Sequence, residues 1–344
     1  MLGALRRRGY EISAALSRRR GFTAPVNAVI VMRHSDRKRT MKPAAFRYHA
    51  PKTIDEAVAI LAEVAPHDGR ILAGGQSLVP TMAFRLARPP HLVDINGVDA
   101  LRRLAVEDGK LCIGAGVRHA AFHRPVVDGP LGRLLSTVVR HIAHYPIRTR
   151  GTFCGSIANA DPASEWCAVA VALGAEMVAR SVRGTRVIPA NAFFAGIMTT
   201  ALQDDELLTE VRLPLLPADT RFGFNEFNRR AGDFAIAMAL AVYRLDGEKI
   251  VEPRIAIGGA EPHARRIAQA EQALAGRLPD ADSFATAADA AASAVDPMED
   301  AQNTADYRRD VVRAVTRRAL DQAMCPAHAG FGSPRDSPRR MISA

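Results

Sequence analysis

The 344-residue sequence is poor in cysteine, and its four cysteines are scattered. Cys112, Cys154, Cys167 and Cys325 include no CxxC pair. Iron–sulfur clusters and structural zinc sites need several thiolates close together, so we expect no metal in this chain. Four scattered cysteines do not resemble a disulfide framework either, which favours a reducing compartment, the cytoplasm.

Long apolar runs and an extended basic surface are also missing. No stretch reaches the roughly 18 unbroken apolar residues of a membrane span. The net charge is +10, but residues 1–40 hold nine Arg and one Lys against Glu11 and Asp36, which is +8. The other 304 residues carry 36 basic and 34 acidic side chains, which is +2. A nucleic-acid-binding role would therefore rest on residues 1–40 alone, and we do not expect one.

Residues 1–40 differ in composition from the rest of the chain, because they are rich in arginine. Arg19-Arg20-Gly21-Phe22 resembles a twin-arginine export signal. The apolar run over 24–32 is short, however, and Arg33 follows it without a small-residue cleavage site. We expect Met41 to be the natural start and 1–40 to be a disordered or spurious extension, and an export signal is the alternative.

From Met41 onward, predicted helices and strands first alternate along the chain. Toward the C-terminal end, predicted strands are grouped together and are followed by predicted helices. Thr53 with Glu56 predicts a capping box at a helix start, and Glu107-Asp108-Gly109 predicts a hairpin turn. Helices are predicted over 53–64, 78–86, 131–144 and 163–173 and widely over 262–324, with Tyr307, Val311, Val315 and Leu320 on one inner face. Strands are predicted over 70–73, 91–95, 101–106, 110–116, around 178 and 187, and over 207–213, 222–227, 235–245 and 249–257.

Two glycine-rich segments are the candidate ligand-binding segments of the chain. The first, ILAGGQSL over 71–78, joins a strand to a helix that Ser77 is expected to cap. The second, RGTFCGSIANADP over 150–162, is predicted to be a polar turn that leads into a helix. Glycines let backbone N–H groups approach a phosphate, and two such turns facing each other could hold a pyrophosphate. Neither segment is a P-loop or a G-x-G-x-x-G fingerprint, so nucleotide binding here needs another scaffold.

Together the two segments resemble a known family. LAGGQSL, followed by Pro80 and Arg85-Leu86-Ala87, is similar to the FAD-binding medium subunits of the carbon monoxide dehydrogenase and xanthine dehydrogenase families. The segment over 150–162 resembles the VRNRGTIGG-S-x-AHADPA block of that family. The resemblance extends over about residues 46–320, and the combination of the two segments is specific.

The resemblance implies an α+β chain with a vanillyl-alcohol-oxidase/PCMH-type FAD-binding fold in two α/β subdomains. A C-terminal domain with a three-stranded antiparallel sheet and helices follows. The implied organisation is an extension over 1–40, FAD-binding subdomains over 41–98 and 99–217, the C-terminal domain over 218–325 and a flexible tail over 326–344.

The resemblance also implies which residues lie around FAD. It implies that 71–78 and 152–156 surround the pyrophosphate and ribityl chain, that Glu165 lies near the polar chain, and that Leu208 lies near the flavin ring. The full implied set is Ile71, Leu72, Ala73, Gly74, Gly75, Gln76, Ser77, Leu78, Thr152, Phe153, Cys154, Gly155, Ser156, Glu165 and Leu208.

Three positions depart from the family pattern. Cys154 stands where a glycine is usual, and a positive φ there would cost about 1 kcal/mol or more. Thr149 and Asn159 stand where Asn and His are common. A scaffold subunit that has lost FAD is therefore one alternative. Cys154 could also be a redox thiol near the flavin, although a small packed side chain is the better interpretation.

Several other polar residues have a functional and a structural interpretation. His141 and His144, three apart on the predicted helix, could bind a metal, but a helix surface explains them better. Arg148 and Arg150 could meet phosphate, or could be solvated or contact a partner. Asp233 is expected to form a turn or cap. Glu165 could be a first-turn helix carboxylate as well as a cofactor contact.

The expected function is that of an oxidoreductase subunit that transfers electrons through FAD and has no catalytic residues of its own. The implied partners are a large molybdopterin subunit and a small subunit with two [2Fe–2S] clusters, in a dimer of heterotrimers, and an external electron acceptor. A stand-alone FAD oxidoreductase of the same fold is the other alternative. The substrate pocket is expected to lie in another chain, and no NAD-binding fingerprint is visible in this one.

Overall fold

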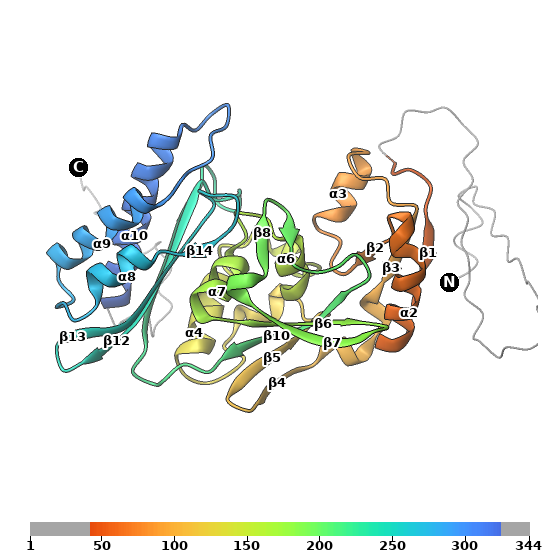
Figure 1. The fold of residues 1–344 in the computed structure, drawn as a ribbon, viewed down its shortest axis with the longest axis horizontal. Helices are drawn as coiled ribbons and strands as arrows, with labels where there is room; N and C mark the ends of the chain where they lie inside the picture. Colours follow the sequence, from red (N-terminus) through yellow and green to blue (C-terminus); the bar gives the residue numbers. More distant parts are fainter. Residues whose placement is uncertain (1–41, 325–344) are drawn as a thin grey trace, which may run out of the picture.

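The computed structural model describes residues 42–324, so the predictions for 1–40 and 326–344 lie outside the described residues. Three main sheets follow one another along the molecule (Figure 1). A small parallel sheet lies at one end, a five-stranded antiparallel sheet lies in the middle, and a four-stranded antiparallel sheet with its helices lies at the other end. This mixed architecture confirms the predicted fold class.

The first sheet has the strand order β1-β3-β2, with β1 at Arg47–His49, β3 at His91–Asp94 and β2 at Arg70–Leu72, all parallel. Helix α2, Ile54–Val64, begins where the capping box predicts. The Thr53 hydroxyl accepts a hydrogen bond from the Glu56 N–H, and the Glu56 carboxylate accepts one from the Lys52 N–H. The α2 residues that face inward are buried, so α2 is held by packing as well as by its cap.

The helix predicted over 78–86 is shorter than expected. Helix α3 spans Leu78–Ala83, and Arg85 adopts a positive φ of 58° that ends it. Ser77 stands at the N-cap position, but its side chain makes no capping hydrogen bond. The prediction that Ser77 caps the helix through its side chain is therefore wrong. Ser77 already has helical backbone angles, and a side chain caps best from a residue with an extended backbone.

The middle sheet has the order β4-β5-β10-β6-β7 and is antiparallel throughout. The predicted hairpin turn is confirmed, with positive φ at Asp108 and Gly109. The strands are β4 Leu104–Glu107, β5 Lys110–Gly114, β6 Glu176–Ser181, β7 Gly184–Pro189 and β10 Leu207–Pro214, and a separate pair is formed by β8 Phe194–Gly196 and β9 Thr199–Thr200. Short 3-10 helices lie at Ala65–His67, Ile95–Gly97, Asp99–Arg102, His119–His123 and Ala190–Ala192.

Two predictions for the middle helices are wrong. The helix predicted over 131–144 ends early: α4 spans Pro130–Val138, and a separate short α5 spans Tyr145–Arg148. The predicted inner face is nevertheless buried, because the chain after α4 turns without leaving the core. The second glycine-rich segment contains a helix, α6 at Phe153–Asn159, where a turn is predicted. Helix α7, Glu165–Leu173, follows as predicted.

The C-terminal sheet has the order β11-β12-β13-β14. Its three predicted strands are β11 Arg221–Phe227, β12 Ala237–Asp246 and β13 Lys249–Gly258, and a two-residue β14, Arg265–Arg266, adds an unpredicted edge. Helices α8 Ala268–Leu274, α9 Ala281–Ala294 and α10 Ala305–Met324 cover one face (Figure 1). Three of the four residues predicted to face inward on α10 are buried, whereas Tyr307, in its first turn, is 41% exposed.

Strand β12 joins the C-terminal domain to the middle of the molecule. Met238, Leu240 and Val242 share a core with α7 and the middle sheet, whereas Ala239 and Ala241, between them, pack under the C-terminal helices. Both faces of this strand are therefore buried, and this fixes the C-terminal domain against the cavity described below. Among residues 42–324, no helix is both long enough and apolar enough to cross a membrane.

Candidate cofactor site

One large cavity lies where the loops of the three sheets meet. Its volume is about 1640 Å³, well above the roughly 300–1,000 Å³ of ordinary small-molecule pockets. Both glycine-rich segments line it, and so do parts of three later segments that the predicted set of site residues does not include. These later segments lie over 198–206, 232–236 and 300–303.

The first glycine-rich segment lines the cavity over its whole length, from Ile71 to Leu78. Gly75 has a φ of +73°, which favours glycine. A Cβ added at Gly74 would lie 2.5 Å from the Arg150 carbonyl oxygen and 2.5 Å from the Gly151 Cα. The two segments therefore touch, backbone against backbone, and only a residue without a side chain fits at the contact.

The second segment meets the cavity at the start of α6. The Thr152 hydroxyl accepts a hydrogen bond from the Gly155 N–H at 3.1 Å and so caps the helix. Thr152, Gly155 and Ser156 line the cavity. The Ser156 hydroxyl lies 2.8 Å from that of Ser164, just before α7, so the two helix starts are joined at the cavity wall.

The side chains of Phe153 and Cys154 point away from the cavity into the core. Phe153 packs on Trp166 with ring centroids 4.7 Å apart. Cys154 is 1% exposed, and its thiol donates to the Ile113 carbonyl at 3.2 Å. Cys154 does not have a positive φ, so the strain considered for this position is not present. Burial raises the pKa of its thiol, which makes it a packed side chain and a poor nucleophile.

Glu165 and Leu208, the two remaining predicted residues, differ in position. Glu165 is half-buried in the first turn of α7 and lines the cavity. Burial, with Glu226 and Asp161 nearby, raises the pKa of its carboxyl to about 8, so the group is mostly uncharged at neutral pH. Leu208 is 4% exposed in β10 and does not line the cavity, because it lies within the core beneath it.

The prediction from sequence missed His119. Its ring is 5% exposed, lines the cavity and lies against Gly151, where an added Cβ would be 2.6 Å from Nε2. The Trp166 Nε1–H donates to His119 Nδ1 at 2.9 Å, so the ring proton is on Nε2. Burial, with Arg118 and Arg148 nearby, lowers the pKa of His119 to about 3, which keeps the ring neutral. No local pattern signals this pair, because 47 residues separate its members.

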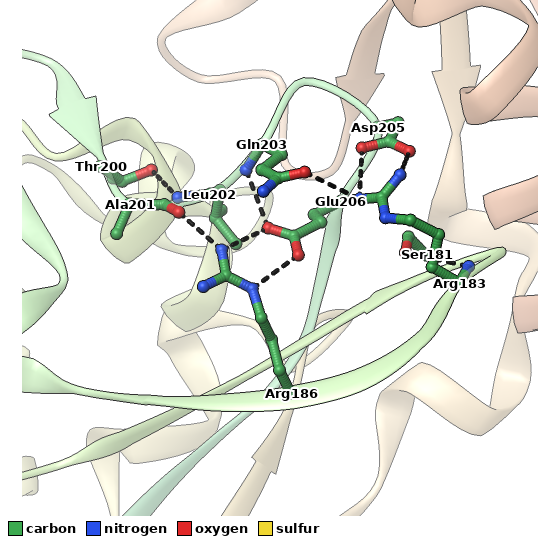
Figure 2. A network of polar contacts seen from close by, with 9 residues as sticks. All are labelled: Ser181, Arg183, Arg186, Thr200, Ala201, Leu202, Gln203, Asp205 and Glu206. Atoms are coloured by element: carbon green, nitrogen blue, oxygen red, sulfur yellow. Dashed lines mark hydrogen bonds and ion pairs between the residues drawn. The ribbon is translucent and has the colours of Figure 1, made fainter.

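The wall over 198–206 is held by the polar network in Figure 2. Arg186 donates to the Glu206 carboxylate at 2.6 and 2.7 Å and to the Ala201 carbonyl at 2.7 Å. Glu206 also accepts the Gln203 N–H at 2.8 Å, and Arg186 lowers the pKa of its carboxyl. Arg183 pairs with Asp205 and donates to the Gln203 side chain (Figure 2). The hairpin of β6 and β7 thus fixes this loop through charge-assisted hydrogen bonds from its turn and from β7.

The C-terminal domain completes the cavity. Phe234 is 75% exposed and presents a free aromatic ring at the lining. The Arg308 guanidinium is buried and donates to the Ile236 and Gly259 carbonyls at 2.8 Å and to Asp300 at 2.6 Å. Arg308, which itself lines the cavity, therefore joins the segments over 232–236 and 300–303.

The other polar candidates have structural roles or lie outside the lining. His141 lies after α4, not on it, and pairs with Glu226 at 3.4 Å. His144 is the N-cap residue of α5. Among residues 42–324, no group of three or more His, Cys, Asp or Glu could hold a metal ion. Arg148 donates to backbone carbonyls of the preceding turn, Arg150 is exposed beside the cavity, and the Asp233 N–H closes a turn onto the Arg230 carbonyl.

Comparison with protein families agrees with this geometry. Residues 44–216 match the FAD binding domain in molybdopterin dehydrogenase, and residues 222–323 match the CO dehydrogenase flavoprotein C-terminal domain. The chain is 40% identical over 284 residues to the caffeine dehydrogenase subunit beta of Pseudomonas sp. strain CBB1, covering 82% of this chain and 96% of that protein.

Solved structures give the same result. Carbon monoxide dehydrogenase from Hydrogenophaga pseudoflava superposes with a TM-score of 0.78 at 37% identity, covering 82% of this chain and 98% of that chain. Quinoline 2-oxidoreductase from Pseudomonas putida 86 superposes with a TM-score of 0.76 at 36% identity. The chain therefore belongs to the family of FAD-binding medium subunits of the molybdenum hydroxylases, oxidoreductase subunits of the carbon monoxide dehydrogenase type.

Proposed function

We propose that this subunit binds FAD in the large cavity, takes electrons from the [2Fe–2S] clusters of a small partner subunit and passes them to an external acceptor. A large molybdopterin subunit would oxidise the substrate. The observation that carries the proposal is that both glycine-rich segments line the same large cavity and touch at Gly74 and Gly151. Bound FAD would supply the chemistry, since a flavin can accept and release electrons one or two at a time.

The lining suits an elongated anionic dinucleotide. The two segments offer glycine backbone for close approach to a diphosphate. The uncharged Glu165 carboxyl and the Ser156 hydroxyl can share hydrogen bonds with polar groups further along the ligand. Phe234, at the C-terminal wall, offers an apolar face to a planar ring. Bound in this way, one ligand would touch all three domains.

Within the predicted set, residues 71–78, Thr152, Gly155, Ser156 and Glu165 are proposed to contact FAD directly. Phe153, Cys154 and Leu208 lie in the core beneath the cavity, so we propose that their side chains act by supporting the walls. The three described cysteines are buried free thiols, which supports placing the complex in a reducing compartment such as the cytoplasm.

The test is the flavin content and reduction of the full chain, purified alone and with the partner chains that accompany it in its host. We expect stoichiometric FAD and reduction of the flavin by the substrate of the complex only when the iron–sulfur and molybdopterin subunits are present. Protein without flavin absorbance in both preparations would refute FAD binding. Flavin reduced by substrate in the isolated chain would instead favour a stand-alone oxidoreductase.

A further inference from the structure

The short segment over 117–119 runs antiparallel to the start of the second glycine-rich segment. The Phe153 N–H donates to the Val117 carbonyl and the His119 N–H donates to the Gly151 carbonyl, both at 3.0 Å. Arg118, between them, forms an isolated β-bridge with Thr152. The backbone of the second segment is therefore aligned on residues 117–119 before any side chain is considered.

The side chain of Arg118 continues from this bridge to the first glycine-rich segment. Its guanidinium donates to the Arg150 carbonyl and to the Asn96 side-chain oxygen. Asn96 in turn donates to the Ala73 carbonyl at 2.8 Å. The Asn96 side chain is oriented by Asp94, which accepts hydrogen bonds from its backbone N–H and its amide. An unbroken chain of hydrogen bonds thus connects Ala73 in one segment to Arg150 at the start of the other.

Arg118 makes its hydrogen bonds to uncharged acceptors. Its acceptors are a carbonyl and an amide oxygen, and none of the ion pairs found among residues 42–324 includes it. Burial and the neighbouring Arg150 and Arg102 lower the pKa of its guanidinium, and Asp94 only partly opposes this. The contribution that the structure shows for this side chain is therefore the pair of hydrogen bonds that its guanidinium makes to two different acceptors.

The link matters because the two segments have no other polar connection in the described residues. Where they touch, Gly74 meets the backbone of Arg150 and Gly151 by van der Waals contact. No backbone hydrogen bond among residues 42–324 joins 71–78 to 150–156. A ligand held by both segments depends on their separation, and reacting or binding groups that shift by about 1 Å lose much of their interaction.

We propose that Arg118 and Asn96 are positioning residues that set the separation of the two glycine-rich segments and thereby the affinity for a diphosphate held between them. This inference rests on the proposed FAD site and adds to it two residues that need not touch the cofactor. The guanidinium can serve two acceptors at once because its N–H groups form a rigid fork, whereas an ammonium group has no such geometry.

The test is a double-mutant cycle on the full chain with Arg118→Gln, Asn96→Ala and the combined variant. FAD affinity is measured by flavin fluorescence and ADP affinity by competition. Each single change is expected to weaken the binding of both ligands about tenfold or more, since it removes a charge-assisted or partly buried hydrogen bond. Both residues act through one link. The affinity of the combined variant is therefore expected to be no lower than that of the single variant with the lower affinity. Effects that multiply would overturn the proposal.

Arg118→Lys separates geometry from charge. We expect the Arg118→Lys variant to bind FAD more tightly than Arg118→Gln but less tightly than the wild-type protein. Wild-type affinity in the lysine variant would show that a positive charge alone suffices, contrary to the proposal. Arg244→Gln is the matched control, because the Arg244 guanidinium also donates to two different side chains, Asp219 and Glu252, but lies in the C-terminal sheet outside the cavity lining. It is expected to leave the affinity for FAD unchanged.

Two outcomes keep the inference distinct from the proposed function. Wild-type protein that binds no FAD would refute the FAD site itself. Wild-type protein that binds FAD together with an Arg118→Gln variant that binds it equally well would refute only the positioning role. Thermal unfolding of the flavin-free variants shows whether they fold, and Asn96→Ala, which removes only a neutral amide, serves if the arginine variant does not.

Discussion

The two glycine-rich segments look alike in sequence, but different interactions hold them in place. The first depends on backbone geometry: Gly75 has a positive φ, Gly74 touches the other segment, and only a six-residue helix follows. The second depends on packing, because Thr152 caps α6 and the side chains of Phe153 and Cys154 anchor it in the core. A cysteine is therefore acceptable in the second segment, whereas a side chain at Gly74 in the first is not.

The largest effect is expected from Gly74→Ala. The new Cβ would lie 2.5 Å from the backbone of the second segment, so the two segments must separate. Overpacking of this kind costs about 1–3 kcal/mol, and we expect FAD affinity to fall by up to about a hundredfold. Gly196→Ala is the control, because a Cβ there has no neighbour within 4 Å. A Gly74→Ala variant with wild-type affinity, measured by fluorescence titration, would contradict the contact between the segments.

The next effect concerns Glu165, at the start of α7. Its pKa is raised from 4.5 to about 8 in the folded protein, so between these values the native state holds a proton that the unfolded state has lost. Stability should therefore fall as pH rises from about 4.5 to about 8. Each pKa unit corresponds to about 1.4 kcal/mol, reduced here by the solvent that reaches the cavity.

Glu165→Gln should flatten this pH dependence, because the amide carries no charge at any pH. Urea unfolding of the flavin-free protein at several pH values measures the slope. Glu248→Gln, at the exposed turn between β12 and β13, is the control and should keep the wild-type profile. An unchanged slope in the Glu165 variant would show that its carboxyl is already ionised in the native state.

A smaller effect is expected from Thr152→Ala. The change removes the oxygen that accepts the Gly155 N–H and should cost about 1 kcal/mol of unfolding free energy. Thr152→Ser keeps the oxygen and should recover most of that loss in chemical denaturation. If alanine and serine destabilise equally, the cap contributes less to the second segment than its packing does.

The smallest effect on binding is expected from Cys154→Ala. The thiol lies in the core and away from the cavity, so FAD affinity should stay within about twofold, with stability lower by about 0.5–1 kcal/mol. Thiol reagents should not modify Cys154 in the folded protein, because burial raises its pKa. A large loss of flavin from the Cys154→Ala variant would mean that the Cys154 side chain contributes to FAD binding, which its position in the core does not predict.

Local signals in the sequence predicted much of the fold. Thr53 and Glu56 marked the start of α2, and Asp108-Gly109 marked a hairpin turn, since both depend on residues within a few positions of each other. Helix ends were harder to predict. The apolar pattern over 131–144 continues past Val138 because the turn after α4 is itself buried, and periodicity alone cannot separate a buried turn from a helix.

By itself the sequence determined the order of the main helices and strands, the two glycine-rich segments and the family to which the chain belongs. Only the tertiary structure decided which side chains of those segments face the cavity, that Cys154 faces the core, and that His119 and the Arg118–Asn96 link stand behind them. The physical reason is distance along the chain. Hydrogen bonds and contacts between residues tens of positions apart leave no periodic or local trace, and their energy appears only once the core brings the segments together.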